Sequence, residues 1–586
     1  MSDSHQLQVQ TVRGLNSIAV RPDERPLRLT DLLRKKHFPL NTRCGERGSC
    51  NGCLVEVLSG RLVHLKTGEI VETGLVRGCE FCPGDSAAEI RVPACSLLAY
   101  EPQVVSEFRL NIPRAHDPLW QVLEVPPDCS LSQALARANR RHPVHIAKDL
   151  PKKLGSKAFA TLEYRGDHWL VANFSPHRPK RTLGAAIDVG TTTVALQLVD
   201  LNDGSLAGSA GGFNRQIHLG DDVATRIGLC AKNPAMLKKL QEAIVDQTIL
   251  PLLALANTEN DPVVCLSIAG NTSMLHLIAG VDPSPMGIFP FEPAFLEHRI
   301  ISTPATHLLP GAAAYIGADL VAGILATGMA YDEGPSLLVD MGTNGEIILK
   351  HDHRLFGCAT AAGPAFEGSG LTNGIRAGAG AIERIHFSNA PFAIQIGVIG
   401  DQTPTGICGS AYLDFLATAH RVGLINDHGR FEKNYLPVTA SHLVNSNGQG
   451  WCLRITRGQE GADILISETD IASLLQAKAA IAAGIMTLLA RAGLVSRDIK
   501  HLYLAGGFGM HLDVANAIAC GLMPGFMPDQ IQVVGNTSLA GAYLALLDCG
   551  VIDELTRISQ NLEVVELNLD PEFESRYIDH LSLKNS

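Results

Sequence analysis

The sequence predicts a multidomain α/β protein whose C-terminal region is a duplicated pair of subdomains, and three observations support this fold class. The chain has 586 residues, which suits two to four domains rather than one. From residue 181 onward the pattern changes to short apolar strand-like runs interspersed with helix-like runs. Within this C-terminal region two different local sequence patterns each occur twice, as expected of an internal duplication.

The repeated patterns are a hairpin and a strand–turn–helix unit. The stretches "LGAAIDVGTTTVALQLVD" (183–200) and "SLLVDMGTNGEIIL" (336–349) each place a D-x-G-T turn between two apolar strands, with Asp188 and Asp340 at the turns. The stretches "SIAGNTSMLHLIAG" (267–280) and "VVGNTSLAGAYLAL" (533–546) each give a strand, a G-N-T-S turn and an apolar helix. We interpret both repeats as products of one duplicated α/β subdomain.

The chemistry of the two hairpins indicates phosphate binding. Gly190 and Gly342 let the backbone approach a ligand closely, and successive N–H groups in such a turn form an anion-binding concavity. Asp188 and Asp340 bring negative charge suited to Mg²⁺, usually through water. Side-chain donors at the turns are Thr191, Thr192, Thr343 and Asn344. Two such hairpins facing each other would hold the phosphates of a nucleotide from both sides.

A third element, "HLYLAGGFGMHLDVANAI" (501–518), reads as a strand, a Gly-Gly turn and a helix, in which Gly506 and Gly507 would let an adenosine lie against the backbone. In this order the three elements resemble the phosphate 1, phosphate 2 and adenosine motifs of the actin, sugar-kinase and Hsp70 ATPase superfamily. The resemblance implies two α/β subdomains with ATP and Mg²⁺ in the cleft between them. It also implies that Asp188 or Asp340 positions the metal or the attacking water.

The N-terminal region, residues 1–107, has a different organisation. The stretch "LQVQTVRGLNSIAVRP" (7–22) predicts two short strands around a Gly-Leu-Asn turn. A short helix follows in "LRLTDLLRKKHF" (27–38), with Thr30 as a candidate N-cap. Strand, turn, strand and helix followed by a cysteine loop is a β-grasp-like order.

The cysteine loop "RCGERGSCNGC" (43–53) carries Cys44, Cys50 and Cys53 among three glycines. A [2Fe–2S] cluster needs four thiolates, and glycines allow backbone N–H groups to come close to its sulfides. The spacing C-x5-C-x2-C resembles the adrenodoxin-type ferredoxin loop. That resemblance implies a distant fourth ligand, for which Cys79, Cys82 and Cys95 are candidates. We assign Cys95, because it precedes an extended segment as the last ligand of those ferredoxins does.

A rival interpretation is a zinc ribbon. Cys50-x2-Cys53 with Cys79-x2-Cys82 has the spacing of a closed four-cysteine zinc site. It leaves Cys44 and the glycines of the loop unexplained. If the ferredoxin interpretation holds, Cys79 and Cys82 are additional thiols near the cluster.

Composition limits the remaining possibilities. Residues 108–180 include basic, proline-containing stretches in a chain of net charge −11, and we assign them to a linker and a small middle domain, followed by the ATPase domain at 181–586. The acidic charge makes nucleic acid an unsuitable partner. The polar start predicts no secretory signal, and "GAAAYIGADLVAGILATGMA" (311–330) predicts a buried helix rather than a membrane span. Fourteen cysteines then suit metal or redox chemistry in the cytoplasm.

The combination of a ferredoxin-like domain and an actin-like ATPase resembles the ATP-dependent reductive activators of corrinoid proteins. The resemblance runs through "NRQIHLGDDVATRI", "TAAGPAFEG", "LLQAKAAIAAGI", "LAGGFG" and the final "DPEFESRYIDHLSL". It implies one-electron reduction of inactive cob(II)alamin to cob(I)alamin on a corrinoid methyltransferase partner. It also implies an upstream electron donor and is compatible with a homodimer.

Two other functions stay open on the sequence. One is activation of another low-potential enzyme, although the ATPases that serve dehydratases place a [4Fe–4S] cluster at a dimer interface and lack a ferredoxin domain. The other is a small-molecule kinase with an accessory metal domain, which needs a further general base. Asp319 and Glu367 are candidates for that base, and Lys478 is also suggestive, but structural roles suit all three at least as well.

Overall fold

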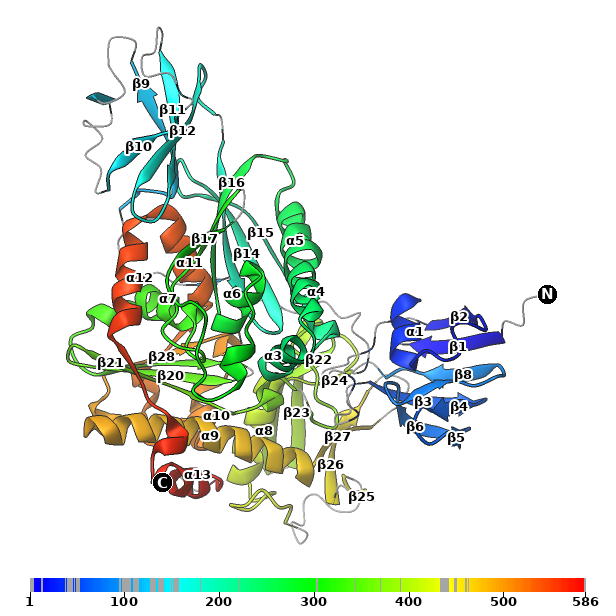
Figure 1. Cartoon of the computed structure of the whole chain (residues 1–586). Coiled ribbons are helices and arrows are strands. Elements are labelled where there is room, and N and C mark those ends of the chain that lie inside the picture. The colour runs from blue at the N-terminus through cyan, green and yellow to red at the C-terminus, as the bar shows by residue number, and fades with distance from the viewer. Residues whose placement is uncertain are drawn as a thin grey trace.

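The computed structural model describes the chain from residue 5 to residue 583 with short gaps. The gaps are 12–13, 37, 39, 41–45, 47, 49–52, 94–95, 97–106, 109–114, 127–132, 135–141, 149, 151–156, 180, 221, 302–303, 343, 369, 390–391, 433–441, 447–449, 459–460, 462 and 508. Figure 1 shows an N-terminal sheet as a separate body, a small sheet at the top of the view, and a large α/β body below it. The fold is therefore a multidomain α/β fold, as the sequence predicts.

The N-terminal body is a five-stranded sheet in the order β2-β1-β8-β3-β6, with helix α1 (Leu29–Lys35) packed into its core. A smaller sheet of order β5-β4-β7 extends it. Strand β1 pairs antiparallel with β2 and parallel with β8, which is the pairing of a β-grasp sheet. The strands are β1 (His5–Thr11), β2 (Gly14–Val20), β3 (Leu54–Ser59), β4 (Leu62–His64), β5 (Ile70–Val71), β6 (Gly74–Arg77), β7 (Phe81–Pro83) and β8 (Ala88–Arg91).

Two local predictions in this body are wrong in detail. The register pairs Thr11 with Gly14, so the predicted Gly-Leu-Asn turn belongs to β2 and the chain reverses before it. Helix α1 is preceded by Arg28, and Thr30 lies inside its first turn with its backbone N–H bonded to the carbonyl of Gly78. Alternation of apolar residues located the strands, whereas the exact turn and cap depended on contacts with distant residues.

The small middle sheet packs on the first α/β subdomain and contributes side chains to the same apolar cluster. It has the order β10-β12-β11-β9 and comprises β9 (Trp120–Val125), β10 (Val144–Ile146), β11 (Ala158–Tyr164) and β12 (Trp169–Ser175). Tyr164 and Trp169 are fully buried in the same apolar cluster as the strands of that subdomain. The chain entering β9 is also bonded to the body, since the N–H of Leu119 donates to the carbonyl of Leu546.

The first α/β subdomain is built on a six-stranded sheet of order β15-β14-β13-β16-β18-β17. Three antiparallel strands are followed by two parallel ones, β16 and β18, and an antiparallel edge. Its elements are β13 (Leu183–Val189), β14 (Thr193–Asp200), β15 (Leu206–Phe213), α3 (Val223–Lys232), α4 (Ala235–Ile244), α5 (Leu250–Ala256), β16 (Val263–Gly270), α6 (Thr272–Ala279), β17 (Arg299–Ile301), β18 (Ala305–Leu308) and α7 (Ala318–Thr327).

The second subdomain repeats this topology in a sheet of order β29-β28-β19-β20-β21-β30. Strands β19, β20 and β21 are antiparallel, and β28 and β29 continue the sheet in parallel. Its central elements are β19 (Ser336–Met341), β20 (Gly345–His351), β21 (Arg354–Thr360), β28 (His501–Ala505), α10 (Val514–Ala519), β29 (Ile531–Gly535), α11 (Thr537–Leu547), α12 (Gly550–Asn561) and β30 (Leu562–Val564).

Further elements enlarge the second subdomain. Two three-stranded sheets and helices α8 and α9 lie between β21 and β28 in the chain, and α13 follows β30. Their bounds are β22 (Ala381–Asn389), β23 (Phe392–Val398), β24 (Gly406–Ile407), α8 (Gly409–Arg421), β25 (Leu443–Ser446), β26 (Gly450–Arg457), β27 (Asp463–Ser467), α9 (Glu468–Ala492) and α13 (Phe573–Asp579).

The topology confirms one predicted repeat and corrects the other. The hairpins β13–β14 and β19–β20 occupy equivalent central positions in the two sheets. The two G-N-T-S units do not, because β16 pairs with the central strand β13, whereas β29 pairs with β28 and lies at the sheet edge. Each unit forms the predicted strand, turn and helix, but their similarity does not come from equivalent positions in a duplication.

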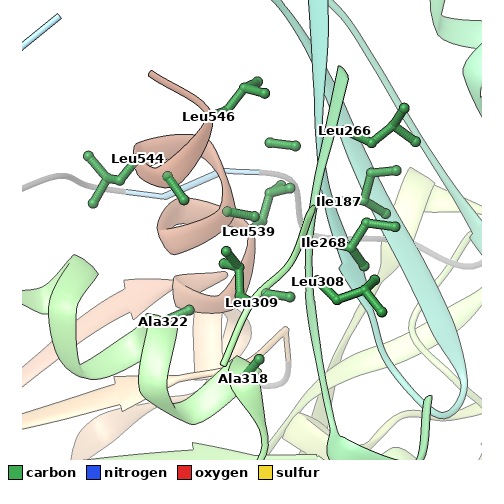
Figure 2. Close-up of a cluster of buried hydrophobic side chains, with 14 of the residues drawn as sticks. Ile187, Leu266, Ile268, Leu308, Leu309, Ala318, Ala322, Leu539, Leu544 and Leu546 are labelled. Carbon is green, nitrogen blue, oxygen red and sulfur yellow. The ribbon is translucent and has the colours of Figure 1, made fainter. Parts of the chain in front are cut away.

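Helices α7 and α11 connect the subdomains. Figure 2 shows α7, with Ala318 and Ala322, and α11, with Leu539, Leu544 and Leu546, beside the strand residues Ile187, Leu266, Ile268 and Leu308, with Leu539 on the side of α11 that faces the strands. Helix α11 follows a strand of the second sheet yet packs on the first, and Gly541 brings it against the backbone of Ala322. Helix α11 therefore belongs to the packed core of both subdomains.

Helix α9 is the one described helix that is long and apolar enough to cross a membrane, with a mean hydropathy of 1.6. Its apolar surface is already covered, because 78% of that window is buried inside the molecule, against β20, β21 and α13. The stretch 311–330 contains α7, a buried ten-residue helix, as predicted. Both helices belong to the protein core.

Candidate functional site

The predicted phosphate and adenosine residues come together in one cleft between the two subdomains, with a cavity volume of about 280 Å³. Both hairpin turns and the turn after β28 contribute to its wall. The predicted residues that line it are Asp188, Gly190, Thr191, Thr192, Asp340, Gly342, Asn344, Gly506 and Gly507. Thr343 lies outside the described residues. Residues far apart in the sequence thus form a single site.

Three backbone carbonyl oxygens of the first hairpin turn accept hydrogen bonds from neighbouring residues. Arg226 of α3 is fully buried and donates to the carbonyl of Thr191 at 2.6 Å. Asn214 donates its side-chain amide to the carbonyl of Gly190 and its backbone N–H to that of Thr192. Because these groups bind the three carbonyl oxygens, the turn is fixed in the orientation that a phosphate-binding loop requires.

The G-N-T-S units have a role that the sequence analysis did not assign. Asn271 caps α6 with its side-chain oxygen and donates its amide to the hydroxyl of Thr191 at 3.1 Å. Asn536 caps α11 in the same way and donates to Asp188 at 2.8 Å. Each asparagine therefore uses one end of its amide as an N-cap and the other to position the first hairpin.

Glycine is required at position 506 by both conformation and space. Its φ is +90°, and a Cβ there would lie 2.7 Å from the Asp340 carboxylate and from the Met341 carbonyl. The turn after β28 thus packs directly on the second hairpin. In this structure Gly506 packs on the second hairpin, and Gly507 beside it also lines the cleft.

Four half-buried carboxyl groups line the cleft. Burial, together with the Asp188 charge, raises the pKa of Asp340 to about 7. Burial and the neighbouring Asp340 charge likewise raise the pKa of Asp319 to about 7, and the pKa of Glu346 lies well above its usual value for the same reasons. Burial also raises the pKa of Asp188, although hydrogen bonds from Ser538 and Asn536 oppose the effect. Like charges in a desolvated site are stabilised by a bound cation.

We expect Asp319→Asn to stabilise the nucleotide-free protein at high pH. The Asp319 pKa rises from 3.8 to about 7 on folding, so between these values the folded carboxyl keeps a proton that the unfolded chain has lost. Stability therefore falls as pH rises through this window, by about 1.4 kcal/mol for each unit by which the two pKa values differ, and is constant above it. Thermal unfolding should show a higher Tm for the variant at pH 8 and a smaller difference at pH 5. An equal difference at both pH values would contradict this assignment.

The carboxylates suit a hydrated Mg²⁺ rather than a directly ligated metal. Over the described parts of the chain, no three His, Cys, Asp or Glu side chains are arranged to hold a metal ion. Mg²⁺ usually keeps several waters and takes only one or two carboxylates together with phosphate oxygens. The half-buried carboxyl groups fit that form of binding.

The structure adds residues that the phosphate and adenosine motifs do not include, among them Asp319 and Glu367, which the sequence offered only as candidate bases. The N-terminus of α8 opens into the cleft through Cys408, Gly409 and Ser410, and a helix N-terminus favours anions. Asp319, Glu346, Glu367 and Arg376 also line it. Lys478 does not, because it is buried in α9 and donates to the carbonyl of Ser582, which confirms the structural role considered for it.

The last residue of the cysteine loop directly precedes a strand of the N-terminal sheet. Cys53 is buried directly before β3, whereas Cys44, Cys50 and Cys95 lie outside the described residues. Within the loop, Glu46 forms ion pairs with Arg28 and Arg34 of α1 at 2.8 and 3.0 Å. These ion pairs fasten the described residues of the loop to the helix.

The three described thiols of the zinc-ribbon alternative are not grouped as metal ligands. Cys53, Cys79 and Cys82 are all described, yet they do not belong to any group of three potential ligands. Cys82 instead donates its thiol to the carbonyl of Val63 at 3.5 Å, and burial raises its pKa. A zinc ligand must be a thiolate, so this geometry counts against the zinc ribbon.

Two α/β subdomains with equivalent hairpins around one cleft define an actin-like ATPase core. Two family models match the chain: the "RACo middle region" at residues 183–332, and the "C-terminal domain of RACo the ASKHA domain" at residues 334–586. The chain belongs to the RACo-type family of reductive activators of corrinoid proteins. Its predicted ATPase domain is divided by the family models between the two equivalent sheets.

Individual relatives agree with this family. The "Corrinoid activation enzyme RamQ" of Eubacterium limosum is 30% identical over 94% of this chain and 95% of its own. The "[Co(II) methylated amine-specific corrinoid protein] reductase" of Methanosarcina barkeri is 26% identical, covering 68% of this chain and 76% of its own. A solved "Reductive activator for corrinoid,iron-sulfur protein" shares 30% identity and 98% coverage of both chains, with a TM-score of 0.72.

Proposed function

We propose that this protein uses ATP hydrolysis to drive one-electron reduction of cob(II)alamin to cob(I)alamin on a corrinoid methyltransferase partner. The observation that carries the proposal is near full-length similarity to activators of corrinoid proteins, in a chain that has both the cleft and the cysteine loop. One electron converts Co(II) to Co(I), while ATP and water give ADP and phosphate. The electron comes from an upstream donor of low potential.

The electron path runs through a [2Fe–2S] cluster on Cys44, Cys50, Cys53 and Cys95. Register supports the inclusion of Cys95, because β8 is antiparallel to β3 and pairs Arg91 with Glu56. The chain after Arg91 therefore leaves the sheet at the end where Cys53 enters β3. Cys82 belongs instead to β7 in the other sheet. When bound, the cluster supplies a one-electron relay, and the thiolates of the loop hold it at the end of the sheet.

The nucleotide site uses the two hairpins. Asp188 and Asp340 position hydrated Mg²⁺ and the attacking water, and the turns at Gly190 and Gly342 contact the phosphates. The remaining phosphate contacts are Thr191, Thr192, Thr343 and Asn344, and Gly506 and Gly507 serve the nucleoside side. Because Asn536 and Ser538 of α11 bond to Asp188, a change at the phosphates reaches a helix that joins both subdomains.

The need for ATP follows from redox equilibrium. For a one-electron couple, about 59 mV corresponds to a tenfold change in equilibrium constant. If the cobalt couple lies a few hundred millivolts below the donor, contact between the two leaves very little cob(I)alamin. A nucleotide-dependent difference in how the activator binds the Co(II) and Co(I) forms shifts that equilibrium.

The direct test follows the absorbance of cob(I)alamin under anaerobic conditions. Donor, activator and a corrinoid protein carrying cob(II)alamin are mixed with ATP, with ADP or without nucleotide. We expect accumulation only with ATP, and faster ATP hydrolysis when the corrinoid protein is present. Equal reduction without ATP would show that the protein is an electron carrier with a regulatory nucleotide site.

A further inference from the structure

Arg376 has a distinctive position in the cleft. Among the described residues that line the cavity it is the single cationic side chain, and the lining also includes the carboxyl groups of Asp188, Asp319, Asp340, Glu346 and Glu367. A nucleoside triphosphate remains anionic after Mg²⁺ binds, so this site requires a compensating cation. Arg376 comes from the segment between η6 (Pro364–Glu367) and β22 of the second subdomain.

Close backbone packing places Arg376 beside Glu367. A Cβ at Gly368 would lie 2.4 Å from the carbonyl of Ile375, and one at Gly374 would lie 2.0 Å from the carbonyl of Gly368. The N–H of Ile375 also donates to the carbonyl of Ile407 at 2.9 Å, next to the start of α8. The segment is therefore fixed, and the Arg376 guanidinium lies 3.8 Å from the Glu367 carboxylate. That separation is an ion pair longer than a hydrogen bond.

The guanidinium also reaches across the cleft. It lies over the ring of Phe213, at 5.3 Å from the ring centroid. Phe213 ends β15 in the first subdomain and is followed directly by Asn214, whose bonds hold the carbonyls of Gly190 and Thr192. Arg376 of the second subdomain thus contacts Phe213 of the first subdomain. The residue after Phe213, Asn214, is hydrogen-bonded to the first hairpin turn.

We propose that Arg376 is the cation that contacts the terminal phosphate of ATP and links the two subdomains in the ATP-bound state. This inference rests on the proposed ATP site. On binding of ATP the guanidinium exchanges its long ion pair with Glu367 for shorter, charge-assisted hydrogen bonds to phosphate oxygens. Phe213 holds it beside the first hairpin before the nucleotide arrives. Loss of the terminal phosphate returns Arg376 to Glu367.

The exchange gives ATP and ADP different effects on the cleft. With ATP, Arg376 and the first hairpin both bind the same phosphate group, so the subdomains are joined through the nucleotide. With ADP, that connection through the terminal phosphate is absent, while the contact with Phe213 remains. A ligand shifts a conformational equilibrium only through such a difference in contacts.

The test compares Arg376→Gln with Arg384→Gln in the full-length protein. Arg384 lies in β22 of the same subdomain, forms a 3.9 Å ion pair with Asp513 and does not line the cavity. Calorimetric titration with ATP and ADP in the presence of Mg²⁺ should show that Arg376→Gln lowers ATP affinity by about 10- to 100-fold and ADP affinity much less. Arg384→Gln should leave the ratio of the two affinities at the wild-type value.

Two further variants separate phosphate contact from structural support. Arg376→Lys keeps the charge but not the planar donor pair, so its ATP-to-ADP ratio should fall between wild type and Arg376→Gln. Phe213→Leu should lower kcat several-fold with a smaller change in that ratio. An unchanged ratio in Arg376→Gln, or in Arg376→Lys if the glutamine variant does not fold, would overturn the inference. Wild-type protein that binds neither nucleotide would instead overturn the proposed ATP site.

Discussion

Asp340→Asn and Asp188→Asn should each reduce ATP hydrolysis by at least about 100-fold, the size of effect seen when one preorganised electrostatic group of an active site is removed. Asp340 lies in the second hairpin, with Gly506 packed against its carboxylate, and it lines the cleft in which we propose that the phosphates bind. Asp188 accepts hydrogen bonds from Asn536 at 2.8 Å and Ser538 at 2.7 Å. An asparagine at position 188 has one side-chain oxygen instead of two. Its NH2 group would face either Asn536 or Ser538, and that residue would lose its hydrogen-bond acceptor. The measurement is steady-state phosphate release with saturating Mg²⁺ and ATP.

A matched control distinguishes loss of the site from loss of the fold. Asp414 of α8 is also a buried aspartate with a raised pKa, and it is bonded to Asn516 away from the cleft. Asp414→Asn should retain hydrolysis within a few-fold of wild type. In both cleft variants the visible spectrum of the N-terminal domain should be unchanged, since the cluster is in a separate body. Both should accept an electron from dithionite yet form no cob(I)alamin.

Hydrolysis at the wild-type rate in Asp340→Asn would contradict the proposed role of the second hairpin. The same result in Asp188→Asn alone would place the Mg²⁺ and the water on the second hairpin only. Because the two aspartates occupy equivalent strands of a duplicated fold, the comparison also tells which half positions the attacking water. The sequence left that assignment open.

The hairpins of the site were predictable because their chemistry is local. A D-x-G-T turn between two apolar strands indicates strand, turn and phosphate-binding geometry within one short stretch of sequence, so Asp188 and Asp340 could be located directly. Arg376 could not be located in this way. Its partner Phe213 lies on the other subdomain, and the glycines that bring it to Glu367 act through backbone contacts that only the folded chain creates.

The G-N-T-S units show how a correct local prediction led to a wrong global one. Each forms a strand, a capped helix start and an apolar helix, as the pattern indicates. Their likeness suggested duplication, but both asparagines instead converge on the first hairpin. The shared sequence therefore reflects a shared chemical task, an amide that caps a helix and positions the phosphate site.

Domain limits were harder to predict than elements. Residues 108–180 differ in composition from the rest, which suggested a separate domain. The inward faces of β11 and β12 carry Tyr164 and Trp169, and these rings complete the core of the first subdomain. Composition describes the exposed residues of such a segment, whereas its large buried rings determine what it packs against.

The cysteine variants should give an all-or-none result. Cys44→Ser and Cys95→Ala should each remove the red-brown colour and lower iron from about two per chain to near zero, because a [2Fe–2S] cluster needs four thiolates. Cys82→Ala and Cys79→Ala should keep both colour and iron. Cys82 is engaged with the carbonyl of Val63, and the backbone of Gly78 before Cys79 is bonded to the carbonyl of Cys53. Anaerobic purification, visible spectra and iron and sulfide analysis make the measurement.

The matched pair Cys95→Ala and Cys82→Ala decides the fourth ligand. Each variant removes one sulfur atom from the same domain, so the two variants are controls for each other. Far-ultraviolet circular dichroism shows whether either variant has lost its fold. The antiparallel register of β3 and β8 places the chain that leads to Cys95 at the Cys53 end of the sheet, which is the reason for expecting Cys95→Ala to be colourless. Colour in Cys95→Ala with none in Cys82→Ala would move the ligand to the second sheet. One zinc per chain and no visible absorption in wild type would replace the electron path by a structural metal and leave the ATPase without a redox centre.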